Sequence, residues 1–145
     1  MNAAYLIQTA EQSGGQLLAE GEYIRIVNIK RLPVSLVEAI KSQKKNLLKI
    51  LKQNEKAEKA GFVIALTGEL YTQTLGRNSV VYVEQIGSRW EAWRETHRPG
   101  KKKPIHFKII AASEEFEYVL LKAKNYFDYI EQKRSGGNLK KVKTG

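Results

Sequence analysis

Hydrophobic positions in the first half of the chain recur at helical spacing, interrupted by one stretch in which apolar and polar residues alternate. Gly21 lies between the two alternating runs, which predicts a tight hairpin. Pro33 suits the first turn of the helix that follows. In chain order, the predicted elements are a helix over 3–12, strands over 16–19 and 22–29, and a helical stripe from Pro33 to Leu51 with a break near Ser42-Gln43.

After residue 61 the apolar period shortens to two, which is typical of strands. The run 79–86 is rich in Val and Tyr, and Gly87-Ser88 after it is a two-residue hairpin signal. Ser113 followed by two glutamates predicts a helix start. The predicted elements are a short apolar run over 62–66, strands over 70–75, 79–86, 89–96 and 105–110, and an amphipathic helix from about Ser113 to Arg134.

The pattern therefore predicts an α+β chain with two folded parts. Residues 1–57 form a small αββαα module, and residues 58–134 form an antiparallel β-meander of about four strands with one long C-terminal helix. Residues 135–145 are expected to be a flexible basic tail. One helix covers only one face of a sheet, so the other face must bind a ligand, pair with another copy or be polar.

Charge narrows the class of partner. Of the 145 residues, 42% are hydrophobic and 28% charged, which predicts a folded chain, and the net charge is +10. This excess favours nucleic acid first and an anionic membrane surface second, with a merely solubilising charge as the alternative. The chain has no cysteine, so disulfides and thiolate metal sites are excluded. A cytoplasmic location, no signal peptide and no membrane span are expected.

Residues 3–52 resemble the small N-terminal docking domains of nonribosomal peptide synthetases, the TubC-like type. The resemblance implies a partner peptide that adds to the hairpin edge, where Tyr23, Arg25 and Val27 alternate with inward residues. The alternative is that these three side chains only pack the module. The matching positions are Leu6-Ile7, Ala10, Gly14, Leu17, Gly21, Ile24-Arg25-Ile26, Pro33, Leu36, Ile40, Lys44 and Leu47-Leu48 with Leu51.

Residues 70–123 resemble the single-stranded-DNA-binding transcriptional positive-coactivator family, the p-fifteen type. The match covers the hairpin 80–95, the Pro-Gly-Lys-rich loop 97–104, the strand 105–110 and the helix start 113–123. The chain departs from the family pattern just before the helix, where Ile105-His106-Phe107-Lys108 replaces the usual Lys-Gly-Ile. The resemblance implies binding of single strands across the sheet and a homodimer through the helix 113–133.

Aromatic and cationic residues between positions 89 and 108 are the candidate ligands for nucleic acid, because rings stack on bases and cations hold phosphates. Side chains alternate along a strand, so Trp90 is expected in the core with Ala92, and Trp93 on the exposed face with Arg89 and Glu91. The lysine turn has a solvated turn as its alternative. The predicted nucleic-acid-binding residues are Arg89, Trp93, Arg94, Arg98, Lys101, Lys102, Lys103 and Lys108.

No catalytic motif is present. The two histidines, His97 and His106, lack metal-ligand spacing, and the chain has neither a phosphate-binding glycine motif nor a nucleophile elbow, so no enzyme, metal or cofactor is expected. The sequence predicts a noncatalytic nucleic-acid-binding protein that prefers single strands and carries a protein-docking module. The alternative is an interaction adaptor, or an inhibitor encoded by a mobile element, whose basic surface binds a protein partner.

Overall fold

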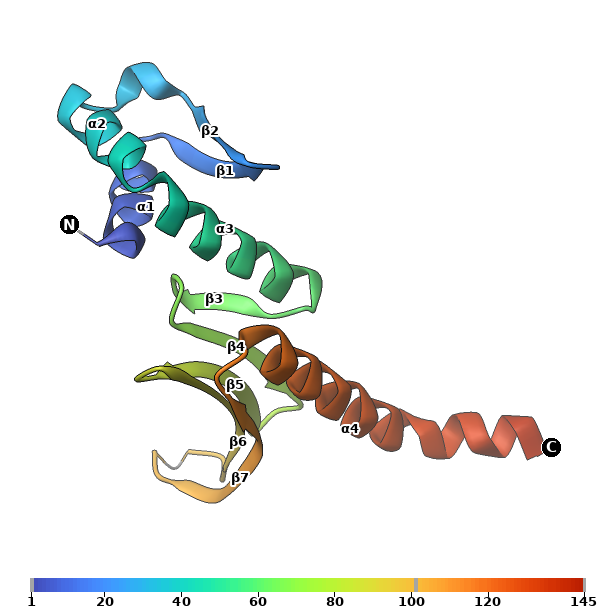
Figure 1. Ribbon diagram of the computed structural model, residues 1–145. Helices are drawn as coiled ribbons and strands as arrows, with labels where there is room; N and C mark the ends of the chain where they lie inside the picture. Colours follow the sequence, from blue (N-terminus) through green and yellow to red (C-terminus); the bar gives the residue numbers. More distant parts are fainter. Residues whose placement is uncertain (1, 101, 145) are drawn as a thin grey trace. The chain divides into compact units, whose positions relative to one another are not determined.

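A computed structural model describes the backbone of residues 2–100 and 102–144 and, within these ranges, the side chains up to Arg134. Over the described residues the chain has four α-helices and two antiparallel sheets, so the predicted α+β class is confirmed (Figure 1). It divides into two units. The first holds Met1–Lys59 with Leu66–Gly68, and the second holds Ala60–Ala65 with Glu69–Gly145.

The first unit has the predicted αββαα order, with a short 3-10 turn η1 (Ile29–Arg31) after the hairpin. Asn2 caps the first helix, since its side-chain oxygen accepts a 2.7 Å hydrogen bond from the Tyr5 N–H. Gly21 adopts a φ of +60° in the hairpin turn, a conformation that favours glycine. The elements are α1 (Ala3–Gln12), β1 (Gln16–Glu20), β2 (Tyr23–Val27), α2 (Val34–Ser42) and α3 (Lys44–Lys59).

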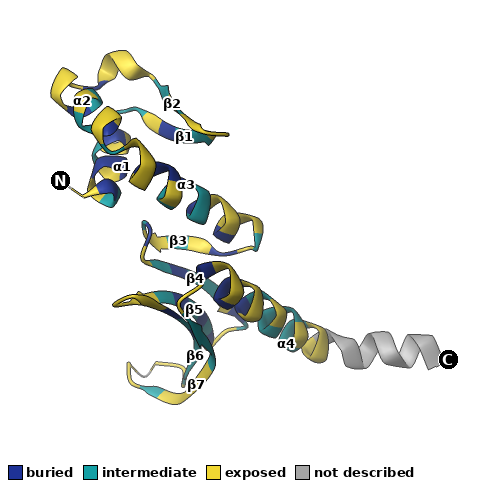
Figure 2. Ribbon diagram, viewed as in Figure 1, coloured by how far each residue is buried: buried dark blue, intermediate teal, exposed yellow. Residues whose placement is uncertain are grey.

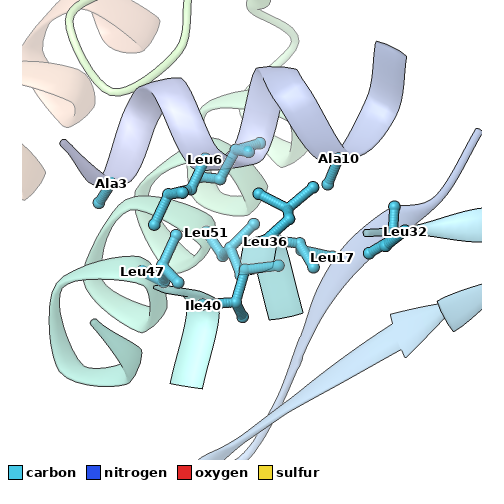
Figure 3. Packing of buried hydrophobic residues seen from close by; sticks show 10 residues of the cluster. Ala3, Leu6, Ala10, Leu17, Leu32, Leu36, Ile40, Leu47 and Leu51 are labelled. Carbon is cyan, nitrogen blue, oxygen red and sulfur yellow. The ribbon is translucent and has the colours of Figure 1, made fainter. Parts of the chain in front are cut away.

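Leucine and isoleucine side chains from every element of the first unit except η1 meet in one core. Leu6 of α1, Ile40 of α2 and Leu47 of α3 are fully buried and point toward one another (Figure 3). Ile24 and Ile26 of β2 pack against this core from its edge. The alternation within β2 therefore sends Tyr23 and Arg25 outward, away from the core.

The second unit is a meander of five strands in sequential order. It has one strand more than the roughly four predicted, because the short apolar run after Phe62 also joins the sheet at its edge. The last strand is longer than predicted and carries register shifts opposite Ala92/Trp93 and Thr96/His97. The strands are β3 (Val63–Leu66), β4 (Leu70–Leu75), β5 (Ser79–Ile86), β6 (Arg89–His97) and β7 (Pro104–Ser113).

The helix α4 (Phe116–Thr144) lies on one face of this sheet, and the opposite face is called here the open face (Figure 1). Ser113 accepts a 3.2 Å hydrogen bond from the Glu115 N–H just before α4 begins. The buried positions of α4 gather in its first turns (Figure 2). There Phe116 meets the Trp90 ring edge-on, with centroids 4.7 Å apart, and the Tyr71 ring at 5.6 Å. The backbone of α4 continues to Thr144, past the predicted helix end near Arg134. The side chains of 135–145 lie outside the described residues, so the flexibility expected of this tail stays a prediction.

Candidate nucleic-acid interface

Three aromatic rings stand side by side across the open face. Tyr82 of β5 is opposite Trp93 of β6, and their rings stack with centroids 4.1 Å apart and planes 15° apart. Phe107 of β7 lies on the other side of Trp93, with a centroid distance of 5.4 Å. We call Tyr82, Trp93 and Phe107 the aromatic ladder.

The ladder changes the expected role of Trp93. Trp90 is 5% exposed and lies in the helix-facing core, as alternation predicts, while Trp93 is on the open face but half-buried. The Tyr82 ring stacks on one flat face of Trp93, and the Phe107 ring lies tilted by 32° on its other side. With one flat face taken by Tyr82 and a second ring beside it, Trp93 offers a base less surface than the freely exposed ring that alternation predicts. Trp93 is therefore one member of a packed row of rings rather than an isolated exposed ring.

The Glu95 carboxylate lies beside Tyr82 of the aromatic ladder. The pKa of Tyr82 is raised above its ordinary value, first because burial disfavours the phenolate and then because the Glu95 carboxylate lies beside it. Glu95 also contacts the His97 ring nitrogen Nε2. The Glu95 carboxylate thus has two partners on the open face, and Tyr82 stays a neutral donor at physiological pH.

Cations gather at one end of the sheet. In a meander, alternate turns fall at the same end, so the β4–β5 turn and the β6–β7 turn are neighbours. A 2.7 Å hydrogen bond from the His97 N–H to the Asn78 carbonyl joins them. Exposed cations from both turns form what we call the basic end; Lys101, predicted to belong to it, is outside the described residues. The basic end consists of Arg77, Arg98, Lys102 and Lys103.

Carboxylates gather at the other end of the sheet, which we call the acidic end. Glu84 and Glu91 lie directly opposite each other there, and Glu69 hydrogen-bonds through its carbonyl to the Gln85 N–H. Arg89, a predicted ligand, is exposed at this acidic end and is therefore separated from the basic end by the length of β6. The acidic end consists of Glu69, Glu84, Glu91, Glu114 and Glu115.

Two other predicted ligands, Arg94 and Lys108, are on the helix-facing side. They are opposite each other in the β6–β7 pairing. The Arg94 guanidinium donates to the Ser79 hydroxyl at 3.2 and 3.3 Å and to the Tyr126 hydroxyl of α4 at 3.0 Å. The Lys108 ammonium lies 5.2 Å from the centre of the Tyr126 ring. These contacts hold both cations against α4, on the face away from the aromatic ladder.

In the first unit, the three predicted partner-binding residues lie on the outward side of β2. Tyr23 is 72% exposed, and the Lys44 ammonium lies 4.9 Å from its ring centre. Arg25 pairs with Glu20 of β1 at 3.2 Å, and Val27 is half-buried. The hairpin is a two-stranded sheet, so β2 has no second strand beside it among the described residues.

Sequence reasoning missed the exposed apolar side of β7. Ile105, Phe107 and Ile109 are 55%, 56% and 61% exposed. The signal was present, since three large apolar residues alternate there with polar or bulged positions. A strand over 105–110 was predicted from the sequence, but none of these three side chains was assigned to a face of the sheet.

Within the described part of the chain, no group of three or more His, Asp or Glu side chains is placed to hold a metal ion. None of the described helices is both long and apolar enough to cross a membrane.

Comparison of this chain with protein-family models, with curated proteins and with solved structures finds no match. The two family resemblances, the partners they imply and the cytoplasmic location therefore stay predictions, and the candidate interface is judged on its own geometry.

Proposed function

We propose that this chain is a noncatalytic nucleic-acid-binding protein whose second unit holds phosphates at the basic end, with single strands preferred. The observation that carries the proposal is the convergence of exposed cations from two separate turns at one end of the sheet. Exposed Lys and Arg side chains neutralise phosphates and release condensed counterions, which favours binding without regard to sequence.

The charge arrangement supports an oriented complex. The acidic end repels phosphates and the basic end attracts them, so a bound strand is held beside the two turns rather than over the whole sheet. The open face beside the turns carries the aromatic ladder. Unpaired bases, unlike those of a closed duplex, can lay apolar surface against such a face, which is the basis for the single-strand preference.

The test is fluorescence anisotropy with a labelled single strand and the matching duplex at several salt concentrations. The double variant Lys102→Ala/Lys103→Ala removes two phosphate contacts, and each contributes about 0.7 to the slope of log affinity against log salt for a single strand. We expect the slope to become shallower by about 1.4 and the single strand to bind more tightly than the duplex.

The matched control is Lys45→Ala/Lys49→Ala, which removes the same charge from exposed positions of α3 in the first unit. It should leave the slope unchanged. The proposal fails if the native chain binds neither oligonucleotide at low salt. It also fails if both double variants weaken binding equally, because net charge alone would then explain the affinity.

A second candidate function, protein docking by the first unit, is favoured by the 72% exposed Tyr23 on β2, a strand that pairs only with β1 in the described part of the chain. We propose that an extended peptide pairs with β2 and contacts Tyr23. Tyr23→Ala should abolish binding of a native protein partner that survives nuclease treatment and leave oligonucleotide affinity unchanged. If Tyr23→Ala lowers oligonucleotide affinity instead, the division of labour between the units is wrong.

A further inference from the structure

The strand β7 combines two properties that folded proteins rarely leave together: an unpaired edge and exposed apolar side chains. It is the last strand in the sheet order, so only β6 pairs with it among the described residues. Its central residues 105–109 are exposed without exception, on both faces of the sheet. An exposed edge strand with large apolar side chains is a template for another strand, and proteins normally block it with charges, prolines or a covering element.

The apolar positions of β7 form a symmetric pattern. Ile105 and Ile109 lie two residues before and two residues after Phe107, and all three are more than half exposed. If a second β7 pairs antiparallel about Phe107, each Ile105 lies opposite an Ile109, and the two Phe107 side chains meet at the centre. The same pairing places Lys102 and Lys103 beside alanines, so no two lysines are opposed.

The charges of the second unit favour the same arrangement. An antiparallel pairing reverses one sheet relative to the other, so the basic end of each copy lies beside the acidic end of its neighbour. Lys102 and Lys103 then approach Glu114 and Glu115 of the second copy. Exposed ion pairs add little affinity, so they select the antiparallel orientation and leave the lysines able to exchange carboxylates for phosphates.

We propose that β7 is a homodimerisation edge, and that a second copy of this chain pairs with it antiparallel about Phe107. The two five-stranded sheets become one sheet of ten strands, and the two aromatic ladders meet at the symmetry axis. This interface differs from the helix-mediated dimer predicted from sequence.

The exposed apolar residues of α4 are less suited to this role. The Tyr118 ring lies 5.5 Å from the Lys122 ammonium, and the Tyr129 ring lies 5.8 Å from the Lys133 ammonium. Each of these rings already has a cationic neighbour on its own helix. The exposed apolar side chains of β7 lie on a strand edge whose backbone can also hydrogen-bond to a second copy, whereas the backbone of a helix cannot, so β7 offers the more complete contact.

The experiment is light scattering on the full chain over a range of concentrations, without nucleic acid. The native chain should have twice the 16.5 kDa mass of one copy. Ile109→Lys places a charge on an exposed edge position, which the fold tolerates. We expect it to weaken the dimer about hundredfold, because symmetry repeats the change and each copy of it costs about tenfold. The control Ile86→Lys makes the same change on the open face at an exposed position of β5, away from the edge, and should remain dimeric.

A charge-reversal pair tests the orientation. Glu114→Lys/Glu115→Lys should raise the dissociation constant at low salt, and adding Lys102→Glu/Lys103→Glu should restore it, which a merely structural effect would not do. A native chain that is monomeric at its highest soluble concentration overturns the proposal. A dimer that survives Ile109→Lys but is lost in Leu121→Lys, on the exposed side of α4, also overturns it and assigns the dimer to the helix. Oligonucleotide binding is measured separately, so neither result decides the proposed function.

Discussion

Replacing Arg94 with methionine removes the guanidinium that links β5, β6 and α4 while keeping most of the aliphatic stem. Sequence reasoning placed Arg94 among the nucleic-acid ligands, whereas the structure points it at Ser79 and Tyr126. The two assignments predict different outcomes for the same variant. If Arg94 is structural, its replacement lowers the free energy of unfolding. If Arg94 faces the ligand, its replacement lowers the affinity for the oligonucleotide.

The contacts set the magnitude of the stability change. Arg94 donates three hydrogen bonds of 3.0–3.3 Å, and hydrogen bonds to charged groups contribute about 1.5–3 kcal/mol each when fully protected from water. Arg94 is only half-buried, so water replaces part of this, and the Ser79 hydroxyl keeps its 2.8 Å contact with Thr96. Relief of repulsion from Lys108 returns a few tenths of a kcal/mol. We therefore expect Arg94→Met to lower the free energy of unfolding by about 2 kcal/mol.

Urea denaturation followed by tryptophan fluorescence measures this loss, because both tryptophans, Trp90 and Trp93, are in the second unit. Tyr126→Phe removes one acceptor and should cost about 1 kcal/mol. The double variant should cost less than the sum of the two, since they share one hydrogen bond. The matched control is Arg98→Met, an exposed turn position, which should change stability by less than about 0.5 kcal/mol.

The reasoning is refuted if Arg94→Met is as stable as Arg98→Met and binds oligonucleotides more weakly than the native chain does. Arg94 would then face the ligand, and the helix-facing side of the sheet would belong to the interface. If Arg94→Met is destabilised but binds normally when folded, Arg94 is a structural residue and the basic end alone holds phosphates.

Two further predictions concern the aromatic residues on the two faces of the sheet. Trp90→Ala should lower the free energy of unfolding of the second unit by about 3–5 kcal/mol, because it leaves a cavity beside Tyr71 and Phe116. Urea denaturation followed by circular dichroism measures this loss. A loss under about 1 kcal/mol would contradict the prediction and mean that the neighbouring side chains fill the cavity. Tyr82→Phe should reduce the loss of stability at alkaline pH. The raised folded-state pKa of Tyr82 gives the native chain a stability that is present below about pH 10 and lost as pH rises through the folded value. Denaturation curves at increasing pH that show the same loss for the variant and the native chain would contradict this.

Local pattern was sufficient to predict most of the elements. The break near Ser42-Gln43 is where α2 ends, and the two-residue hairpin at Gly87-Ser88 joins β5 to β6 with Gly87 at a φ of +63°. Strong alternation and glycine turns act within a few residues of one another, so they are readable without tertiary information. The edge strand β3 was predicted only as a short apolar run, because four residues are too few to show a two-residue alternation.

The candidate site was harder to predict because its geometry comes from pairing. Alternation alone predicted that Trp93 and Trp90 lie on opposite faces of the sheet. Only the pairing of β5, β6 and β7 brings Tyr82 and Phe107 beside Trp93 on the open face. In the sequence, Arg94 likewise cannot be told apart from the other cations near the lysine turn. Its contact with Tyr126 joins residues 32 positions apart, which no local pattern encodes.

The charge polarity of the second unit is a consequence of its topology. Arg77 and Arg98 are far apart in sequence, yet a meander returns every second turn to the same end of the sheet, so their turns meet there. By the same rule, glutamates near the starts of β4 and α4 share the opposite end with Glu84 and Glu91. A net charge of +10 gives no hint of this separation. The proposed phosphate binding at one end of the sheet and the proposed antiparallel pairing along β7 both depend on this separation, because attraction in each case depends on where the charges lie rather than on their sum.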